Sequence, residues 1–274
     1  MRSLSAAGRR ARSAPALLFV VMLLALAPAA AGCDMPSTGG LGQVYGSGTP
    51  VTKSYDFTGF TNVTVDSGCV ATVDYGESFA VSVTVDDNLV EEHLKVELDG
   101  DTLHVGLADL WQYRDVTLTA KVTLPRLTGL EVSGASTVSG VMSGDLVLAV
   151  SGESKTWLKG EDKVAVDLSG ASSLSGDVSG VELSGDVSGA SVVDLMGSAA
   201  RLRLDVSGGS HLDLPQLITQ DADLTLSGGS RGSVIVTGTL SVDASGGSQL
   251  EYAGDPRLGS IDVSGGSAVE PAGD

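Results

Sequence analysis

The sequence holds few of the residue types from which metal centres and active sites are built. Its 274 residues include two Cys and only three His, which are His93, His104 and His211. None of these histidines has another His or Cys at the spacing of a zinc site. The Gly-rich stretches lack the Lys of a phosphate-binding loop and the Gly-Gly-x-Gly-x-Asp repeat that binds calcium. We therefore expect no enzyme and no cofactor.

Basic and aromatic residues are also scarce. The chain has 16 Lys and Arg against 34 Asp and Glu, which gives a formal net charge of −18 at pH 7. Nucleic-acid binding depends on Lys and Arg that displace phosphate counterions, so this charge excludes that class of partner. Only one aromatic residue, Tyr252, follows Trp157. A broad globular core needs large side chains, and we therefore expect a thin core in the second half.

The first 32 residues have the order of a secretory signal peptide. Four Arg precede an apolar run from Ala16 to Leu26, and small residues follow. Ala30-Ala31-Gly32-Cys33 resembles the lipobox of bacterial lipoproteins, which implies that Cys33 carries a lipid anchor in the membrane. Two alternatives stay open: cleavage without lipidation, and a Cys33–Cys69 disulfide. No later apolar run reaches 18 residues, so we expect no transmembrane helix in the mature chain.

The rest of the chain divides into three parts. Residues 33–50 hold the lipidated Cys and a Gly- and Ser-rich stretch that is typical of a flexible tether. Residues 51–132 alternate apolar and polar side chains, and Asp99-Gly100 between two such runs predicts a hairpin. We expect this second part to begin a stack of coils and to cap its open end. Residues 133–274 carry the repeat.

A four-residue unit, Ser-Gly-(Ala/Gly/Glu)-Ser, defines that repeat. It begins at residues 133, 151, 169, 188, 207, 227, 245 and 264, at intervals of 18, 18, 19, 19, 20, 18 and 19 residues. Short alternating runs such as Leu130-Glu-Val132 precede most units, and a second alternating run follows. One strand, a tight turn with Gly at positive φ, another strand and a return of variable length make one coil. The sequence therefore predicts a parallel β-helix with coils of 18–20 residues.

One outward column of this predicted solenoid is acidic. The position two before each unit holds an acid in six of eight coils, and alternation turns it away from the core. A solvated face that resists strand addition is one interpretation. The other is a cation-binding or partner-binding column, with weak calcium binding because hard cations prefer oxygen ligands. The residues concerned are Glu131, Asp167, Asp186, Asp205, Asp243 and Asp262.

Several of these features together resemble a known family. Phe57-x-x-Phe60, Val63-Thr-Val65, Asp86-Asp-Asn-Leu89, the Asp99-Gly100 hairpin and the Ser-Gly-(Ala/Gly)-Ser turns are similar to the head GIN domain of "putative autotransporter adhesins". The resemblance covers about residues 54–267. It implies a right-handed β-helix that bacteria export, often behind a lipoprotein signal, and it implies adhesion without a catalytic motif. A left-handed hexapeptide β-helix is the alternative fold, but the drift to 19 and 20 residues argues against it.

These observations favour a non-enzymatic, surface-anchored, adhesin-like lipoprotein. It would present an acidic, Ser/Gly-rich face to an envelope protein or a glycan, from a membrane facing the periplasm or the cell exterior. A carbohydrate-active enzyme is a second hypothesis, and carboxylates converging in a groove would favour it. Trp111 and Trp157 can stack on sugars, although we expect Trp111 to pack in the cap and Trp157 to cover an early coil. An envelope stress or assembly protein that binds peptide along a solenoid edge is a third hypothesis.

Overall fold

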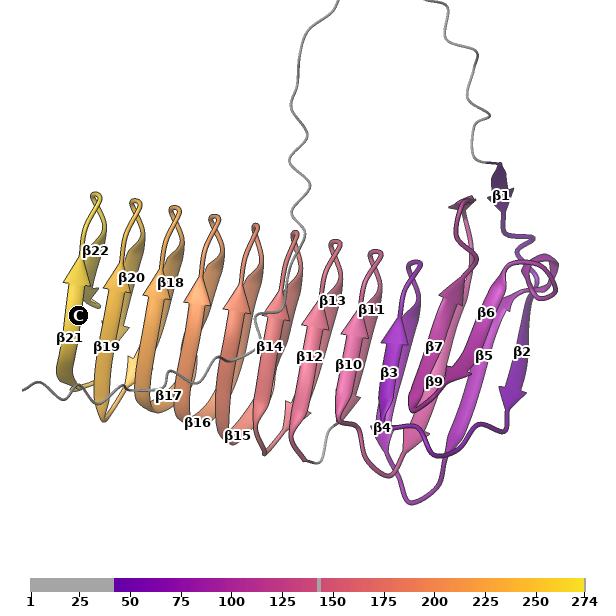
Figure 1. Ribbon diagram of the computed structural model, residues 1–274, viewed down its shortest axis with the longest axis horizontal. Coiled ribbons are helices and arrows are strands. Elements are labelled where there is room, and N and C mark those ends of the chain that lie inside the picture. Colours follow the sequence, from indigo (N-terminus) through magenta and orange to yellow (C-terminus); the bar gives the residue numbers. More distant parts are fainter. Residues whose placement is uncertain (1–41, 142–143, 274) are drawn as a thin grey trace, which may run out of the picture. The chain divides into compact units, whose positions relative to one another are not determined.

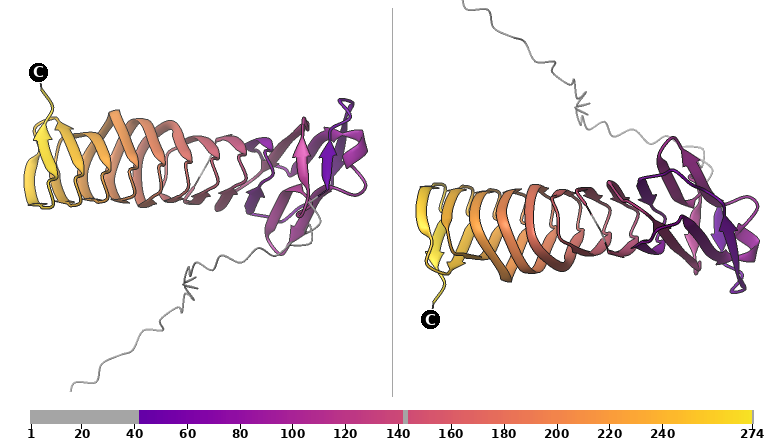
Figure 2. Two further views of the ribbon diagram at one scale, coloured as in Figure 1. Left: turned by 90° about the horizontal axis from the view of Figure 1, so that it is seen from above. Right: turned by 90° about the horizontal axis from the view of Figure 1, so that it is seen from below.

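The protein is a β-solenoid closed at one end by antiparallel strands (Figure 1). The computed structural model describes residues 42–141 and 144–273, and most of these residues lie in strands. One short 3-10 helix, η1 (Asp87–Leu89), is found in this part of the chain. The predicted all-β solenoid is confirmed, and Figure 2 shows its coils side by side along one axis.

Each coil consists of two strands, which lie on opposite faces of one sheet that wraps around the core; we call these two faces the first sheet and the second sheet. The first sheet contains the strands before the Ser-Gly units: β10 (Gly129–Val132), β12 (Leu146–Val150), β14 (Val164–Leu168), β19 (Thr239–Ala244) and β21 (Arg257–Val263). The second sheet contains the strands after them: β11 (Thr137–Val141), β13 (Lys155–Gly160), β18 (Arg231–Val236), β20 (Gln249–Ala253) and β22 (Ala268–Pro271). Three long strands pass through the bend and serve both sheets, namely β15 (Ser173–Val187), β16 (Val192–Val206) and β17 (His211–Leu226).

Neighbouring coils pair in parallel, with equivalent residues opposite each other. Leu130 pairs with Leu148, which pairs with Val166 in the following coil. In the longer coils the register shifts at the bend, between Asp194 and Met196 and between Leu214 and Ile218. The return therefore absorbs the variation in coil length, as the drifting period predicts, and the strands and turns stay in register.

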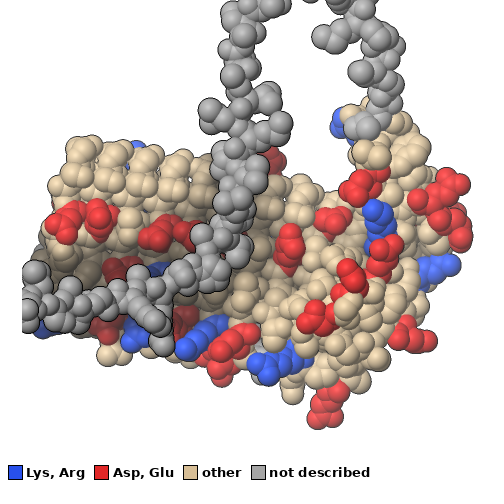
Figure 3. Space-filling view, in the orientation of Figure 1, with Lys and Arg blue, Asp and Glu red and all other residues tan. Residues whose placement is uncertain are grey.

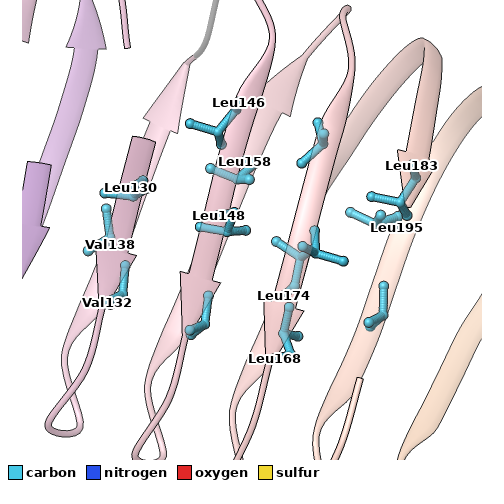
Figure 4. Close-up of a cluster of buried hydrophobic side chains, with 14 of the residues drawn as sticks. Leu130, Val132, Val138, Leu146, Leu148, Leu158, Leu168, Leu174, Leu183 and Leu195 are labelled. Carbon is cyan, nitrogen blue, oxygen red and sulfur yellow. The ribbon is translucent and has the colours of Figure 1, made fainter. Parts of the chain in front are cut away.

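The core is a narrow double layer of aliphatic side chains between the two sheets. Leu130, Leu148 and Leu168 point inward from the first sheet and meet Val138 and Leu174 from the second (Figure 4). Each of these side chains is at most 2% exposed. Leu, Val and Ala fill the space without aromatic rings, which confirms the thin core expected of the second half.

The turns of adjacent coils stack more closely than side chains would allow. All eight glycines at the second position of the unit have positive φ, as predicted, from 61° at Gly265 to 80° at Gly189. A Cβ atom on Gly189 would lie 2.2 Å from the carbonyl oxygen of Gly170 in the coil before. Glycine is therefore required here both by the left-handed backbone and by the close approach of the neighbouring turn.

A ladder of buried serines runs beneath these turns. The serine at the fourth position of every unit except the last is at most 1% exposed. Several of these hydroxyls donate to the carbonyl oxygen of the first serine in the same unit, as from Ser210 to Ser207 at 2.8 Å and from Ser230 to Ser227 at 2.7 Å. Between coils, the amide of Ser136 donates to the Oγ atom of Ser154 at 3.2 Å. The hydroxyls thus satisfy backbone groups that the turn leaves without a strand partner.

The stack of coils begins within residues 51–132, before the first repeated Ser-Gly-x-Ser unit. Strands β3 (Asn62–Val65) and β4 (Val70–Tyr75) form a coil that pairs in register with β10 and β11. On its other side lie β7 (Thr102–Leu107) and β9 (Leu118–Leu124), which come later in the chain. The β3–β4 coil is therefore inserted between two segments that follow it in sequence. The division at residues 132 and 133 marks where the repeated unit starts, and the stack starts earlier.

Antiparallel strands complete the cap. β5 (Ala80–Asp86) pairs with both β2 (Pro50–Tyr55) and β9, and β6 (Leu94–Asp99) forms the expected hairpin with β7. A separate two-stranded sheet lies beside them, in which β8 (Gln112–Arg114) pairs in parallel with β1 (Gln43–Tyr45). These strands lie at one end of the stack, and the aromatic pair Phe60–Phe79 packs there with ring centroids 5.0 Å apart.

The predicted tether over residues 33–50 is too long at its C-terminal end. Residues 43–45 form β1, and Pro50 already belongs to β2. The buried Asp86 carboxylate accepts hydrogen bonds from the amides of Gly48, at 3.1 Å, and Thr117, at 2.8 Å. Asn88 accepts from the amide of Ser47 and donates to the carbonyl oxygen of Tyr45. These contacts hold the segment against η1, and residues 33–41 lie outside the described part of the chain.

Candidate functional surfaces

The positions of the acidic column predicted from the repeat form one row on the outer face of the first sheet. Its positions pair in register from coil to coil, from Glu131 opposite Ala149 to Asp243 opposite Asp262. All six acids are exposed, and Ala149 and Thr225 interrupt the series. Figure 3 shows acidic side chains along the strands of the first sheet, below the turns. Asp167, Asp186 and Asp205 thus stand directly beside one another on three consecutive coils.

These acids have no cationic partner within the residues that the structure describes. None of the six forms an ion pair with an N–O distance of 4.0 Å or less. The one side-chain hydrogen bond on the column is that from Ser260 to Asp262, at 2.8 Å. The column therefore presents uncompensated negative charge to solvent.

A second charged column lies nearer the bend and compensates itself. It contains Asp145, Lys163, Glu182, Arg201 and Asp221, in which acids and bases alternate from coil to coil. Glu182 lies 3.5 Å from Lys163 and 3.3 Å from Arg201. Lys163 and then Arg201 lower the pKa of Glu182. Every member stands six residues before a Ser-Gly unit, but the alternating sign of the charge hides this column in the sequence.

This column also bears on the hypothesis of a glycan-cleaving enzyme. Asp145, Lys163 and Glu182 line a surface depression of about 380 Å³ together with Arg126 and Ser184. A glycosidase needs one carboxylic acid that stays protonated near neutral pH. Lys163 and Arg201 favour the ionised form of Glu182, which opposes its use as the protonated general acid of a glycosidase.

The histidines and serines offer no site among residues 42–141 and 144–273. No group of three His, Cys, Asp or Glu residues in these ranges is suited to a metal ion. His93 is buried against Trp111 and Tyr113 in the cap, whereas His211 is exposed on β17. Gly228-Gly-Ser-Arg-Gly232 has the letter pattern of a nucleophile elbow, but Ser230 is a buried member of the serine ladder. Its hydroxyl is engaged within the turn and is not an exposed nucleophile.

Cys69 occupies the first step of the serine ladder. Its amide donates a hydrogen bond to the Oγ atom of Ser136 at 3.2 Å, as the amide of Ser136 does to the Oγ atom of Ser154. The thiol is fully buried, and burial together with the Asp66 carboxylate raises its pKa to about 12. Burial and the raised pKa both disfavour the reactive thiolate form of Cys69. Cys33, the predicted lipidation site, lies outside the described residues, so the alternative disulfide stays untested.

The two tryptophans lie on different parts of the surface. Trp111 stands in the cap with its ring edge against His93, at a centroid distance of 5.0 Å, and it is 45% exposed. Trp157 lies on the outer face of β13 and is 43% exposed. It therefore projects from the second sheet, with the short side chains of Ser139 and Ser175 opposite it on the two adjacent strands. No helix in the described residues is long and apolar enough to cross a membrane.

Comparison with solved structures identifies close matches in fold. A "putative adhesin" from Parabacteroides merdae is 19% identical, with a TM-score of 0.78, and the alignment covers 85% of this chain and all of that one. A "putative adhesin" from Parabacteroides distasonis is 18% identical, with a TM-score of 0.75 and coverage of 84% and 100%. A "putative lipid binding protein" from the same species is 19% identical, with a TM-score of 0.70 and the same coverage. These likenesses establish the fold.

The family is established by the sequence itself. A search of curated proteins finds no match. The family described as "Putative auto-transporter adhesin, head GIN domain" matches residues 59–256, which span the β3–β4 coil, the cap strands from β5 to β9 and the repeat as far as β20. This description supports an adhesin-like role at the cell envelope or exterior rather than an enzymatic one. The chain belongs to the head GIN domain family of auto-transporter adhesin-like proteins.

Proposed function

We propose that this protein is a non-enzymatic lipoprotein of the cell envelope that presents its solenoid to a partner. In this proposal the lipid on Cys33 holds the chain at a membrane, and the residues between Cys33 and β1 connect the anchor to the cap. The acidic column of the first sheet supplies the binding surface. The observation that carries the proposal is that six exposed acids in register have no cationic partner among the described residues.

The arrangement suits a partner with basic groups at regular intervals. Equivalent positions on neighbouring strands lie about 4.8 Å apart, so the column offers a charge on each coil over most of its length. A basic segment of an envelope protein laid along the solenoid axis would neutralise several acids together. The alternating column beside it, which compensates itself, adds little net charge to this attraction.

Calcium is a second ligand of the same column in this proposal. Two carboxylates on neighbouring coils, such as Asp167 and Asp186, would share one ion through their oxygen atoms, and water would complete its coordination. The described residues contain no group of three metal-binding side chains, so the association is weak.

The test of the partner surface compares two faces of one molecule. The full chain, purified in detergent, would be crosslinked in envelope extracts as wild type and as Asp167→Asn/Asp186→Asn/Asp205→Asn. The matched control is Asp194→Asn/Asp213→Asn/Glu251→Gln, which removes the same charge from the second sheet. Loss of one defined crosslinked species in the first variant and its persistence in the control are expected. Equal loss in both would show that net charge, and not the column, attracts the partner.

Anchoring is tested separately by Cys33→Ser. Cys33 is the only residue of the lipobox-like sequence that can take the lipid, so the substitution should move the protein from the detergent phase to the aqueous phase. Cys69→Ser is the matched control, because Cys69 is buried in the fold and should not affect partitioning. Partition of wild type into the aqueous phase would contradict the lipid anchor.

A further inference from the structure

The outer face of the second sheet changes character along its length. One row of outward residues, six positions after each Ser-Gly unit, is traced by the pairing of Thr72, Ser139, Trp157 and Ser175 on successive coils. The row continues into the cap through Lys121, Ser82 and Ser54. In the other direction it becomes acidic, with Asp194, Asp213, Ser233, Glu251 and Glu270. The half nearer the cap therefore carries hydroxyls, a lysine and a tryptophan.

Trp157 is accessible because its neighbours in this row are short. Ser139 and Ser175 lie directly across from it on the adjacent strands. Its outward neighbours along β13 are Lys155 and Lys159, two residues away on either side. The ring is 43% exposed and does not take part in the aromatic contacts of the cap. An exposed tryptophan edged by hydroxyls offers a flat apolar surface with hydrogen-bonding groups at its margin.

Positive charge is concentrated beside this ring in a chain that is strongly acidic. Lys155 has Thr137 and Ser173 as its cross-strand neighbours, and Lys121 has Thr72 and Ser82. Neither lysine forms an ion pair within 4.0 Å in the described residues. Lys159 stands opposite Asp177 and is partly compensated. Lys155 therefore lies two residues from Trp157 on the same strand, and Lys121 lies in the row of Trp157, three strands toward the cap.

We propose that this patch, comprising Trp157, Lys155, Lys121 and the serines and threonines between them, binds an anionic polysaccharide of uronic acid type. A pyranose ring stacks its C–H face on the indole, the hydroxyls bind its hydroxyl groups, and the lysines bind its carboxylates. A sugar chain along the solenoid axis places successive units over successive coils. The low charge density of such a chain fits two lysines, whereas a nucleic acid needs far more basic residues. This inference names a partner class for the adhesin-like role proposed above and rests on it only for the biological context.

The acidic half of the same row gives the ligand a direction. Beyond Ser175 the row continues with Asp194 and Asp213, which repel a carboxylate. The anionic chain therefore extends from Trp157 toward Lys121 and the cap, and not toward β22. Substitutions on the two sides of Trp157 should accordingly have opposite effects.

The test measures binding of oligogalacturonate to the full chain in detergent, by calorimetry and by the fluorescence of tryptophan. Trp157→Ala should weaken binding at least tenfold, and Lys155→Glu should weaken it further. Trp111→Ala is the matched control, since Trp111 is similarly exposed but lies in the cap. It should leave the affinity unchanged. Asp194→Asn should raise the affinity severalfold, and circular dichroism should show that each variant is folded.

Four results would overturn the proposal. They are absence of binding at millimolar oligogalacturonate, equal affinity of Trp157→Ala and wild type, equal binding of a neutral dextran, and unchanged affinity after Lys155→Glu. The variant Asp167→Asn/Asp186→Asn/Asp205→Asn should bind oligogalacturonate as wild type does. If this variant keeps glycan binding but loses its protein crosslink, the two surfaces act separately. If the wild-type protein shows the crosslink but does not bind oligogalacturonate, the glycan proposal fails and the proposal for the acidic column stands.

Discussion

Asp205 and Val206 are neighbours in the chain but face opposite sides of the first sheet. Val206 is 1% exposed, whereas Asp205 projects into solvent. Val206→Asp should lower the free energy of unfolding by about 3 kcal/mol or more, because it buries an unpaired carboxylate. Asp205→Val should change it by about 1 kcal/mol at most, because the side chain stays in solvent and only the repulsion from Asp186 is lost. Thermal melts of both variants measure the difference, and the reverse order would mean that the strand register is off by one residue.

The Cys69 thiol makes a pH-dependent contribution that can be isolated. Its pKa is raised to about 12 in the folded protein, mainly by burial, from an ordinary value near 9. Between these values the unfolded chain loses the thiol proton while the folded chain keeps it, so stability falls as the pH rises. The slope is at most about 1.4 kcal/mol per pH unit.

Cys69→Ser should remove that part of the slope, because serine does not titrate in this range. Serine is also the residue that the other coils place at the same step of the ladder. Urea unfolding of both proteins at pH 8 and pH 10.5 tests this, and the other titrating groups cancel in the comparison. Parallel pH profiles would show that the thiol ionises as freely in the fold as in the unfolded chain.

At the scale of the elements, the turn is the part of the coil that tolerates least change. Gly189→Ala would place a Cβ against the Gly170 carbonyl, and its φ of 80° is also unfavourable for alanine. Gly229 has a similar φ of 83°, but a Cβ there meets open space. Gly229→Ala should cost about 1 kcal/mol and Gly189→Ala about 1–3 kcal/mol more. Equal melting temperatures for the two variants would contradict the close stacking of the turns.

How far the sequence predicts these elements depends on whether they repeat. The eight units fix the turns, the inward columns and the acidic column, because a single period relates equivalent residues. The pairing of β3 with both β7 and β10 has no such signal, since it joins segments at unrelated spacings. The three-residue strands β1 and β8 are too short to alternate recognisably. The exposure of Trp157 follows from the alternation of β13, in which Lys155, Trp157 and Lys159 face outward.

For the whole molecule, the main electrostatic feature is a line of like charges on one face. Asp167, Asp186 and Asp205 stand on consecutive coils without cationic partners in the described residues. Each repulsion amounts to a few tenths of a kcal/mol to about 1 kcal/mol at low salt. Sodium chloride should therefore raise the melting temperature by screening.

Millimolar calcium should raise the melting temperature more than sodium chloride of matched ionic strength, if neighbouring carboxylates share the ion. The variant Asp167→Asn/Asp186→Asn/Asp205→Asn should lose the difference between the two salts. The variant Asp194→Asn/Asp213→Asn/Glu251→Gln serves as the control and should keep it. A calcium effect no greater than that of sodium in the wild-type protein would leave the column a solvated face.

The position of the β3–β4 coil determines the order in which a newly made chain can acquire its structure. Residues 62–75 emerge before both of their partners, residues 102–124 on one side and 129–141 on the other. Both edges of this coil stay unpaired during that interval, and closing them brings together segments distant in the chain, which is slow. Each later coil pairs with the coil that directly precedes it in the chain, so it can add to a structure that has already formed. Duplication or loss of a coil beyond residue 141 should therefore change the length of the solenoid without changing the slow pairing of the β3–β4 coil.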